Sequence, residues 1–149
     1  GGGVVAKMAG DALYGPRSLS DQLHAMDYSG ADVVGKQAHY MYLKGLDATI
    51  LRFPEREHRY TDFVAGPTIM ARRELALTIP FLATSRGEDT AFLRNAAAAG
   101  ATLYAADRFN FVQVRSDGGI AHTWDVTSSE LLANSRVEFF GRNTGHIFC

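Results

Sequence analysis

The chain has 149 residues, enough for one domain with a sizeable core, and its hydrophobic fraction of 46% and charged fraction of 21% are ordinary for a soluble globular protein. A formal net charge of −1 gives no electrostatic reason to expect binding to nucleic acid or to an anionic membrane surface. The one cysteine, Cys149, excludes an internal disulfide and a metal cage built from cysteines.

The first half of the chain predicts three strands and one helix. Short runs of β-branched, aromatic or apolar residues bounded by turn residues are typical of strands. These runs are residues 4–8, residues 32–43 with an interruption at Gly35, and residues 48–53. Apolar residues recur at helical spacing from residue 19 to residue 26, and Gly30 ends this helix. Residues 54–60 are a charged loop.

The second half predicts further strands alternating with helices. Residues 63–70 read as a strand around Gly66, and residues 72–77 as a short helix. The clearest helix, residues 88–99, opens with two acids and closes at Gly100. The remaining expected elements are strands at residues 101–105, 109–115 and 137–140, and a helix that starts at Asp125 or Thr127 and runs to about Asn134.

This alternation predicts an α/β fold with a mixed sheet flanked by helices. We find no internal repeat, so residues 1–149 are expected to form a single domain. No apolar stretch approaches the roughly 20 residues of a membrane-spanning helix. Residues 1–3 lead straight into a strand-like run, without the pattern of a signal peptide. We therefore expect a cytoplasmic protein without a membrane span.

Two carboxylates, Glu88 and Asp89, open the helix at residues 88–99 behind a polar loop. A carboxylate held there beside a substrate can take the proton from an attacking hydroxyl group. Acids in a first helical turn equally serve as caps and interact favourably with the helix dipole. The spacing alone leaves both roles open.

The histidines do not form a recognisable zinc motif, because none of the five makes an HxH or HExxH pair. His122 lies two residues before Trp124, the only tryptophan. A histidine this close to a tryptophan could be a metal ligand or a sugar contact. It could also be a residue that packs at the end of a strand. No nucleophile with a nearby histidine and no glycine-rich phosphate loop is present.

Aromatic side chains are spread through the predicted strands, where alternating positions favour core and sheet-face packing. A few of them could instead be stacking platforms for sugar rings. The residues concerned are Tyr40, Tyr42, Phe53, Tyr60, Phe63, Phe109 and Phe111. Six arginines are interspersed with acids and are either solvated or paired with a diphosphate. They are Arg52, Arg56, Arg59, Arg72, Arg73 and Arg86.

Four segments, taken in order, resemble the second half of a family-two glycosyltransferase of the GT-A type. They read VVAKMAGDALYGP, SGADVVGKQAHYMYL, FVAGPTIMARREL and GEDTAFLRNAAAAGATLYAADRFNFVQVR. The resemblance extends from Val4 to about Phe140 and is greatest to bacterial enzymes that decorate polysaccharides or other cell-surface glycans. It implies a nucleotide-diphospho-sugar transferase fold, and transfer of a sugar from a nucleotide-sugar donor to a glycan or other hydroxyl acceptor.

In that family the first strand ends in a cluster of aspartates followed by LYGP, and these aspartates hold a divalent metal that bridges the donor diphosphate. Mg²⁺ or Mn²⁺ suits this place because both prefer oxygen ligands and neutralise charge on the departing diphosphate. Asp11 matches one of these ligands, whereas Ala9, Gly10 and Ala12 stand where the family has carboxylates. The resemblance therefore implies a metal site reduced to one acid, with weak metal binding.

The resemblance also assigns roles to other residues. Asp89, with Glu88 as the alternate, would be the general base of an in-line, inverting displacement at the anomeric carbon. His122 would lie near the metal and the diphosphate. Gly66 and Thr68 would lie near the acceptor side of the sheet. Trp124 is a further candidate for substrate binding.

The family places a nucleotide-binding half before the aspartate strand, and almost nothing precedes Val4 here. We therefore expect a domain truncated at its N-terminal, donor side, with an exposed sheet edge that favours a homo-oligomer or pairing with the missing half. Two hypotheses follow: a glycosyltransferase-like domain, and a non-catalytic scaffold that dimerises or binds a glycan. The depleted acids at residues 9–12 favour the scaffold, and the GED motif at residues 87–89 favours the enzyme.

Overall fold

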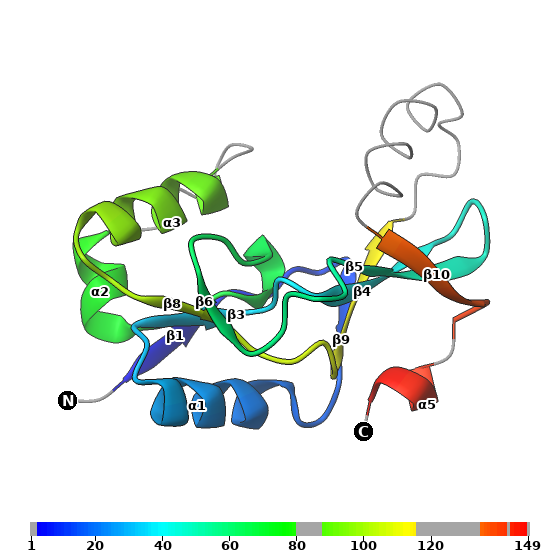
Figure 1. Ribbon diagram of the computed structural model, residues 1–149, viewed down its shortest axis with the longest axis horizontal. Coiled ribbons are helices and arrows are strands. Elements are labelled where there is room, and N and C mark those ends of the chain that lie inside the picture. The colour runs from blue at the N-terminus through cyan, green and yellow to red at the C-terminus, as the bar shows by residue number, and fades with distance from the viewer. Residues whose placement is uncertain (1–2, 80–87, 116–134, 143, 149) are drawn as a thin grey trace. The chain divides into compact units, whose positions relative to one another are not determined.

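The computed structural model describes residues 3–79, 88–115, 135–142 and 144–148. Within them the chain is an α/β protein with mixed sheets flanked by helices, which confirms the expected fold class (Figure 1). The chain divides into two compact units, each described by itself. Unit 1 comprises Gly1–Met8, Leu19–Gln37 and His58–Ala106, and unit 2 comprises Ala9–Ser18, Ala38–Glu57 and Asp107–Cys149.

Unit 1 contains a mixed sheet, here sheet A, in which β3 and β8 run parallel and the other neighbours pair antiparallel. In spatial order the strands are β1 (Val4–Ala6), β7 (Met70–Arg72), β3 (Val33–Gly35), β8 (Leu103–Ala105) and β6 (Arg59–Thr61). The helices of this unit are α1 (Ser18–Ser29), α2 (Arg73–Thr78) and α3 (Glu88–Ala98).

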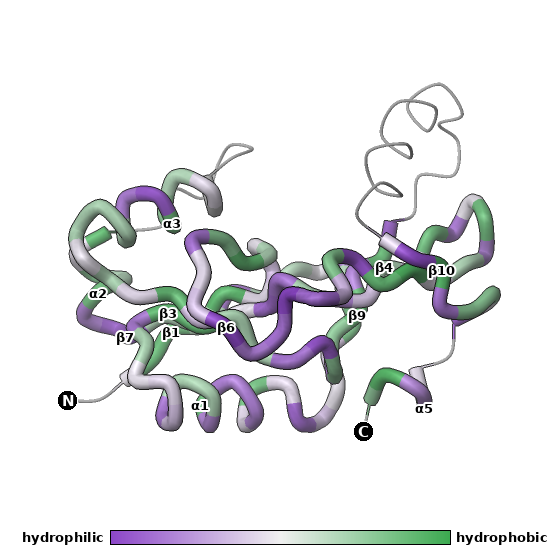
Figure 2. The backbone as a smooth tube through the Cα atoms, in the orientation of Figure 1, coloured by the Kyte–Doolittle hydropathy of each residue, from purple (hydrophilic) through white to green (hydrophobic). Residues whose placement is uncertain are grey.

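Apolar side chains on both faces of β3 explain why helices cover both faces of sheet A. Val33 packs in a cluster with Phe92 and Leu93 of α3. The next residue, Val34, packs with Met26 of α1, because successive side chains of a strand point to opposite faces. Figure 1 shows α1 and α3 on opposite sides of the sheet. In Figure 2 the central strand β3 is hydrophobic and the edge strand β6 is hydrophilic, as this layering requires.

Glycines end the two long helices. Gly30 follows α1 with φ +69°, and Gly100 follows α3 with φ +92°. A side chain is strained in this left-handed region, so glycine is the usual residue after a helix. Gly30 and Gly100 thus end the two helices as the sequence predicts. The last residue of α3 is Ala98, one residue earlier than predicted.

Unit 2 contains the second mixed sheet, sheet B. Its strands in spatial order are β10 (Ser135–Phe140), β5 (Ala48–Arg52), β4 (His39–Leu43), β9 (Phe111–Arg115) and β2 (Ala12–Tyr14). Tyr40, Leu51 and Val112, from three neighbouring strands, pack against Ile147 of the short helix α5 (Thr144–Ile147). The β4–β9 pair is parallel, and the other pairs are antiparallel.

Three local predictions are corrected. The interruption predicted at Gly35 is confirmed, because β3 ends there, but residues 32–43 are not one strand: β3 and β4 belong to different sheets. Residues 63–70 are not a continuous strand, because Gly66–Thr68 forms a short 3-10 helix, here η1, and only Met70 belongs to a strand. Pro67 lacks the N–H that a strand ladder uses, and the Thr68 hydroxyl donates to the Ala65 carbonyl across the turn (2.6 Å). The charged loop predicted at residues 54–60 is shorter, because β6 begins at Arg59. The strand β2 and the helix α5 were not predicted either.

The helix expected from Asp125 or Thr127 lies outside the described residues. Among the residues that are described, no helix is both long and apolar enough to cross a membrane.

Gly35 provides a test of the packing in unit 1. A Cβ at this position would lie 2.6 Å from Val64 Cγ2 and 3.0 Å from Thr68 Oγ1. We expect Gly35→Ala to lower the free energy of unfolding by about 1–3 kcal/mol, the usual cost of overpacking a core. Gly10→Ala is the control, because nothing lies within 4 Å of its Cβ, and it should change stability by less than about 0.5 kcal/mol. Equal urea denaturation midpoints for the two variants would contradict this packing.

Candidate functional site

The carboxyl ends of three strands meet at one edge of sheet A. β3 and β8 are parallel, with Gly35 opposite Ala105. β1 and β3 are both antiparallel to β7, so β1 runs in the same direction and ends beside them. Ligands of open α/β sheets bind outside the carboxyl ends of the strands. This carboxyl edge is therefore the first place to look for a site in unit 1.

The short helix η1 lies at the same edge, since it immediately precedes β7, and Met70 at the start of β7 pairs with Ala6 and Val34. Thr68 of η1 is buried, and its hydroxyl is hydrogen-bonded twice. The Lys36 backbone N–H donates to Thr68 Oγ1 (2.8 Å), and the hydroxyl donates to the Ala65 carbonyl. Two of the residues predicted for the acceptor side, Gly66 and Thr68, thus lie together at the carboxyl edge.

Two buried polar residues complete this edge, and the sequence analysis missed both. Gln22 of α1 is 5% exposed and donates from Nε2 to the Thr68 carbonyl (2.6 Å). Its Oε1 is buried and has no hydrogen-bond partner in the described part of the chain. Lys36 is 2% exposed, and lysines are seldom so deeply buried. We call Gln22, Lys36 and Thr68 the polar cluster. A buried acceptor without a partner is uncommon in folded proteins, which makes this cluster notable.

A sequence signal for Gln22 exists in hindsight. It lies three and four residues before Ala25 and Met26, which are both buried on the face that α1 turns toward the sheet. A polar residue on such an apolar stripe must find a partner inside the fold.

The helix α3 begins toward the carboxyl edge. Its C-terminal end leads into Thr102, whose N–H donates to Asp32 Oδ2 (3.0 Å) at the opposite, amino end of β3. Figure 1 shows α3 running back over the sheet from that end. Glu88 and Asp89 form the first two positions of α3. Their side chains lie outside what the structure describes, so their roles as base and alternate remain predictions.

A cavity of about 360 Å³ lies at the amino edge of sheet A, between α2 and residues 99–101. Its polar lining includes the ion pair between Arg72 Nε and Asp32 Oδ1 (3.6 Å), whose side chains are 44% and 39% exposed. An exposed pair of this kind contributes little to stability or to selective binding. None of the residues lining this cavity is buried, so the polar cluster at the other edge is the stronger candidate site.

Asp11 belongs to unit 2, in the turn between β1 and β2. Its backbone carbonyl accepts from the Val114 N–H (3.2 Å), and its side chain is exposed. The turn is fixed by Tyr14, whose hydroxyl oxygen accepts from the Ala9 N–H (2.8 Å) and whose ring packs on Phe111 at 5.3 Å. The loop therefore keeps an ordered shape around one carboxylate.

The residues described here do not fit the divalent metal that the family resemblance implies. Beside Asp11 the loop offers only the side chains of Ala9, Gly10 and Ala12, which carry no ligand atoms. Throughout the described ranges no group of three histidine, cysteine or acidic side chains is close enough to hold a metal ion. His122 and Trp124 lie outside those ranges, as does the remainder of residues 116–134.

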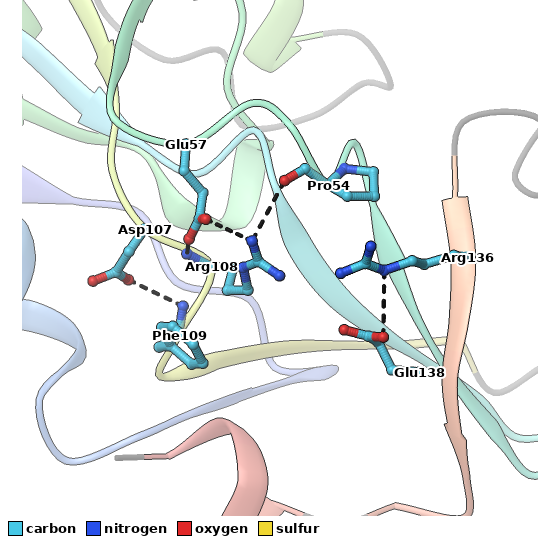
Figure 3. A network of polar contacts seen from close by, with 7 residues as sticks. All are labelled: Pro54, Glu57, Asp107, Arg108, Phe109, Arg136 and Glu138. Carbon is cyan, nitrogen blue, oxygen red and sulfur yellow. Dashed lines mark hydrogen bonds and ion pairs between the residues drawn. The ribbon is translucent and has the colours of Figure 1, made fainter.

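A second polar network in unit 2 joins the loop after β5 to the start of β9 (Figure 3). Arg108 donates from its backbone N–H to Glu57 Oε2 and from Nη2 to Glu57 Oε1, both at 2.7 Å. The hydrogen bond to Glu57 raises the pKa of Arg108 above its ordinary value. Both side chains are about 20% exposed, so this pair is worth more than a surface salt bridge and fastens the loop in place.

No protein-family model matches this chain, and it has no significant match among curated proteins. The case for its function therefore depends on the motif order and on the geometry described above.

Thr68→Val tests the polar cluster. The substitution keeps the shape of the side chain but leaves the buried Lys36 N–H without its acceptor, so the free energy of unfolding should fall by about 1–3 kcal/mol. Thr78→Val is the matched control, because Thr78 is exposed and its hydroxyl donates to the Glu74 carbonyl within the same helix. It should cost less than about 0.5 kcal/mol in the same chemical denaturation experiment. Equal losses of stability in the two variants would show that the buried hydrogen bond of Thr68 contributes no more than the exposed one of Thr78.

Tyr40 gives unit 2 a pH dependence. Burial raises the pKa of this phenol above its ordinary value of 10.0, so the neutral form is favoured in the folded state. This contribution to stability is complete below about pH 10 and is lost as the pH rises through the folded-state pKa. In urea titrations above pH 10 the wild-type chain should lose stability more steeply than Tyr40→Phe. Parallel pH profiles of the two proteins would contradict the assignment.

Proposed function

We propose that this chain is a glycosyltransferase-like domain, related to enzymes that transfer a sugar from a nucleotide-sugar donor to a hydroxyl acceptor in the assembly of cell-surface glycans. The observation that carries the proposal is the common location of its motif segments. β1, β3 and η1 come from three separate segments of the resemblance, and all end or begin at the carboxyl edge of sheet A. The start of α3, from the fourth segment, lies toward the same edge.

In the proposed reaction Asp89 takes the proton of the acceptor hydroxyl, with Glu88 as the alternate base. The acceptor oxygen then forms a bond to the anomeric carbon from the side opposite the leaving group. The bond between that carbon and the diphosphate oxygen breaks, its electron pair leaves with the nucleoside diphosphate, and the configuration inverts. A base at the first turn of a helix is held in place by the helix itself, which supports this role.

The polar cluster supports an acceptor site at this edge. Thr68 is held by hydrogen bonds from Gln22 and Lys36, and the Gly66 carbonyl accepts from the Ile69 N–H, so the η1 backbone has a fixed geometry. On this proposal Thr68 acts by positioning η1, because its own hydroxyl is already bonded inside the fold.

A second candidate function is favoured by the loop around Asp11. With alanine or glycine at residues 9, 10 and 12, the loop lacks the carboxylates that would compensate the charge of a departing diphosphate through a metal. A chain altered in this way suits a non-catalytic scaffold that binds a glycan or dimerises through an exposed sheet edge. This alternative predicts no transfer from any donor, and the first proposal predicts transfer from one.

Asp89→Asn distinguishes the two candidates. Loss of a general base should lower kcat for sugar transfer about 10²–10⁴-fold, with little change in melting temperature. Glu74→Gln is the matched control, because Glu74 is an exposed acid in the first turn of α2, and its removal should leave turnover unchanged. If Asp89→Asn retains full turnover, Asp89 is not the base. A wild-type chain without turnover on UDP-, GDP- and dTDP-sugars would favour the scaffold.

A further inference from the structure

Exposed aromatic rings gather at the β6 edge of unit 1. Tyr60 of β6 lies 5.1 Å from Tyr104 of β8, and Tyr28 of α1 lies 5.7 Å from the same ring, as measured between ring centroids. His24, one turn earlier in α1, contacts Tyr28 at 5.4 Å. We call Tyr28, Tyr60 and Tyr104 the tyrosine platform. Tyr60 is one of the aromatic residues that the sequence predicts as possible stacking platforms.

The platform has a buried centre and exposed flanks. Tyr104 is 8% exposed, whereas Tyr60 is 61% and Tyr28 is 52% exposed. Both outer rings meet Tyr104 edge to face, at 71° and 88°, which is a favoured geometry for aromatic pairs. The central ring therefore supports two outer rings that stay open to solvent.

Hydrogen bonds restrain the outer rings. The Tyr60 hydroxyl donates to the Ser29 carbonyl (2.5 Å), and the Tyr28 hydroxyl lies 3.5 Å from His58 Nδ1. Because ring positions are restrained before a ligand arrives, binding would cost less conformational entropy than ordering two free side chains. What the platform offers to a partner is the surface of the two rings.

This chemistry fits the pyranose rings of a glycan. The face of an aromatic ring is negative, and it attracts the slightly positive C–H groups that cover one side of a sugar ring. The centroids of Tyr28 and Tyr60 are no more than about 11 Å apart, since each lies within 5.7 Å of Tyr104. This upper limit allows neighbouring sugar rings of one glycan chain to reach both tyrosines. His58 and Arg59, beside the platform, can hydrogen-bond sugar hydroxyls.

Other occupants fit less well. The edge strand β6 has three residues, Arg59, Tyr60 and Thr61, and it is hydrophilic in Figure 2. A short, charged edge discourages strand pairing with a second copy of the chain. The formal net charge of −1 gives no electrostatic support for stacking nucleic-acid bases.

We infer that the tyrosine platform is a glycan-binding surface, in which Tyr60 and Tyr28 stack against neighbouring sugar rings. The platform shares no residue with the polar cluster, and glycan binding to it requires neither a nucleotide-sugar donor nor a metal ion. The inference rests on the second candidate function, to which it gives a binding surface, and it requires no step of the proposed sugar transfer. A glycan held here would be bound whether or not this chain performs catalysis.

Isothermal titration calorimetry with maltohexaose, cellohexaose and chitohexaose tests this inference on the full chain. We expect at least one of the three to bind at millimolar concentration, and Tyr60→Ala to weaken that binding about tenfold. Tyr60→Phe keeps the ring and should retain most of the affinity. Phe140→Ala is the matched control, because Phe140 is an aromatic residue of unit 2 with 81% exposure. It should bind like the wild-type chain.

Three results would overturn the inference. These are the absence of binding to all three oligosaccharides, equal affinity of Tyr60→Ala and wild type, and an equal loss in Phe140→Ala. A dimer in sedimentation that dissociates in Tyr60→Ala, without any glycan binding, would likewise overturn it and identify a second copy as the partner. Because the measurement is binding and not turnover, failure here leaves the proposed transfer reaction to its own test.

Discussion

The hydrogen bonds of Thr68 hold together three segments of unit 1 that are distant in sequence. Its hydroxyl accepts from the Lys36 N–H after β3, its carbonyl accepts from Gln22 of α1, and the turn around it leads directly into β7. Gly35 permits this approach, because any larger residue would collide with Val64 and Thr68. The carboxyl edge of sheet A keeps its shape through this junction, and the candidate acceptor site depends on that shape.

The two units contrast in the chemistry that they retain. Unit 1 has a buried polar cluster with an unused acceptor at the edge where α/β proteins bind ligands. In unit 2 the Asp11 turn is ordered by Tyr14 but carries one carboxylate, too few for the metal site of the family that the chain resembles. A polar cluster in unit 1 and a turn without a metal site in unit 2 are the reason why a glycosyltransferase-like domain and a glycan-binding scaffold are the two proposals.

Local signals predicted part of this structure, and non-local contacts decided the rest. Helical periodicity and a following glycine located α1 and α3, because both signals lie within the helix and its first neighbour. Gly35 indicated the interruption within residues 32–43, but nothing local showed that β3 and β4 join different sheets, since their parallel partners, β8 and β9, lie far along the chain. Gly66 and Thr68 were proposed for the acceptor side through the family resemblance, and this role stays a prediction. Gln22 and Lys36 escaped prediction because their partner, Thr68, is 46 and 32 residues away.

Donor binding is the most direct test of the central claim, that this chain is a glycosyltransferase-like domain. Thermal unfolding would be followed with UDP-, GDP- and dTDP-sugars, each with Mn²⁺ and again with a chelator. A ligand that binds only the folded chain stabilises it by about 2.7 kcal/mol at 100 times its Kd, which raises the melting temperature measurably. The account predicts such a rise with one of the three nucleotides. An unchanged melting temperature with all three, with and without Mn²⁺, would contradict it.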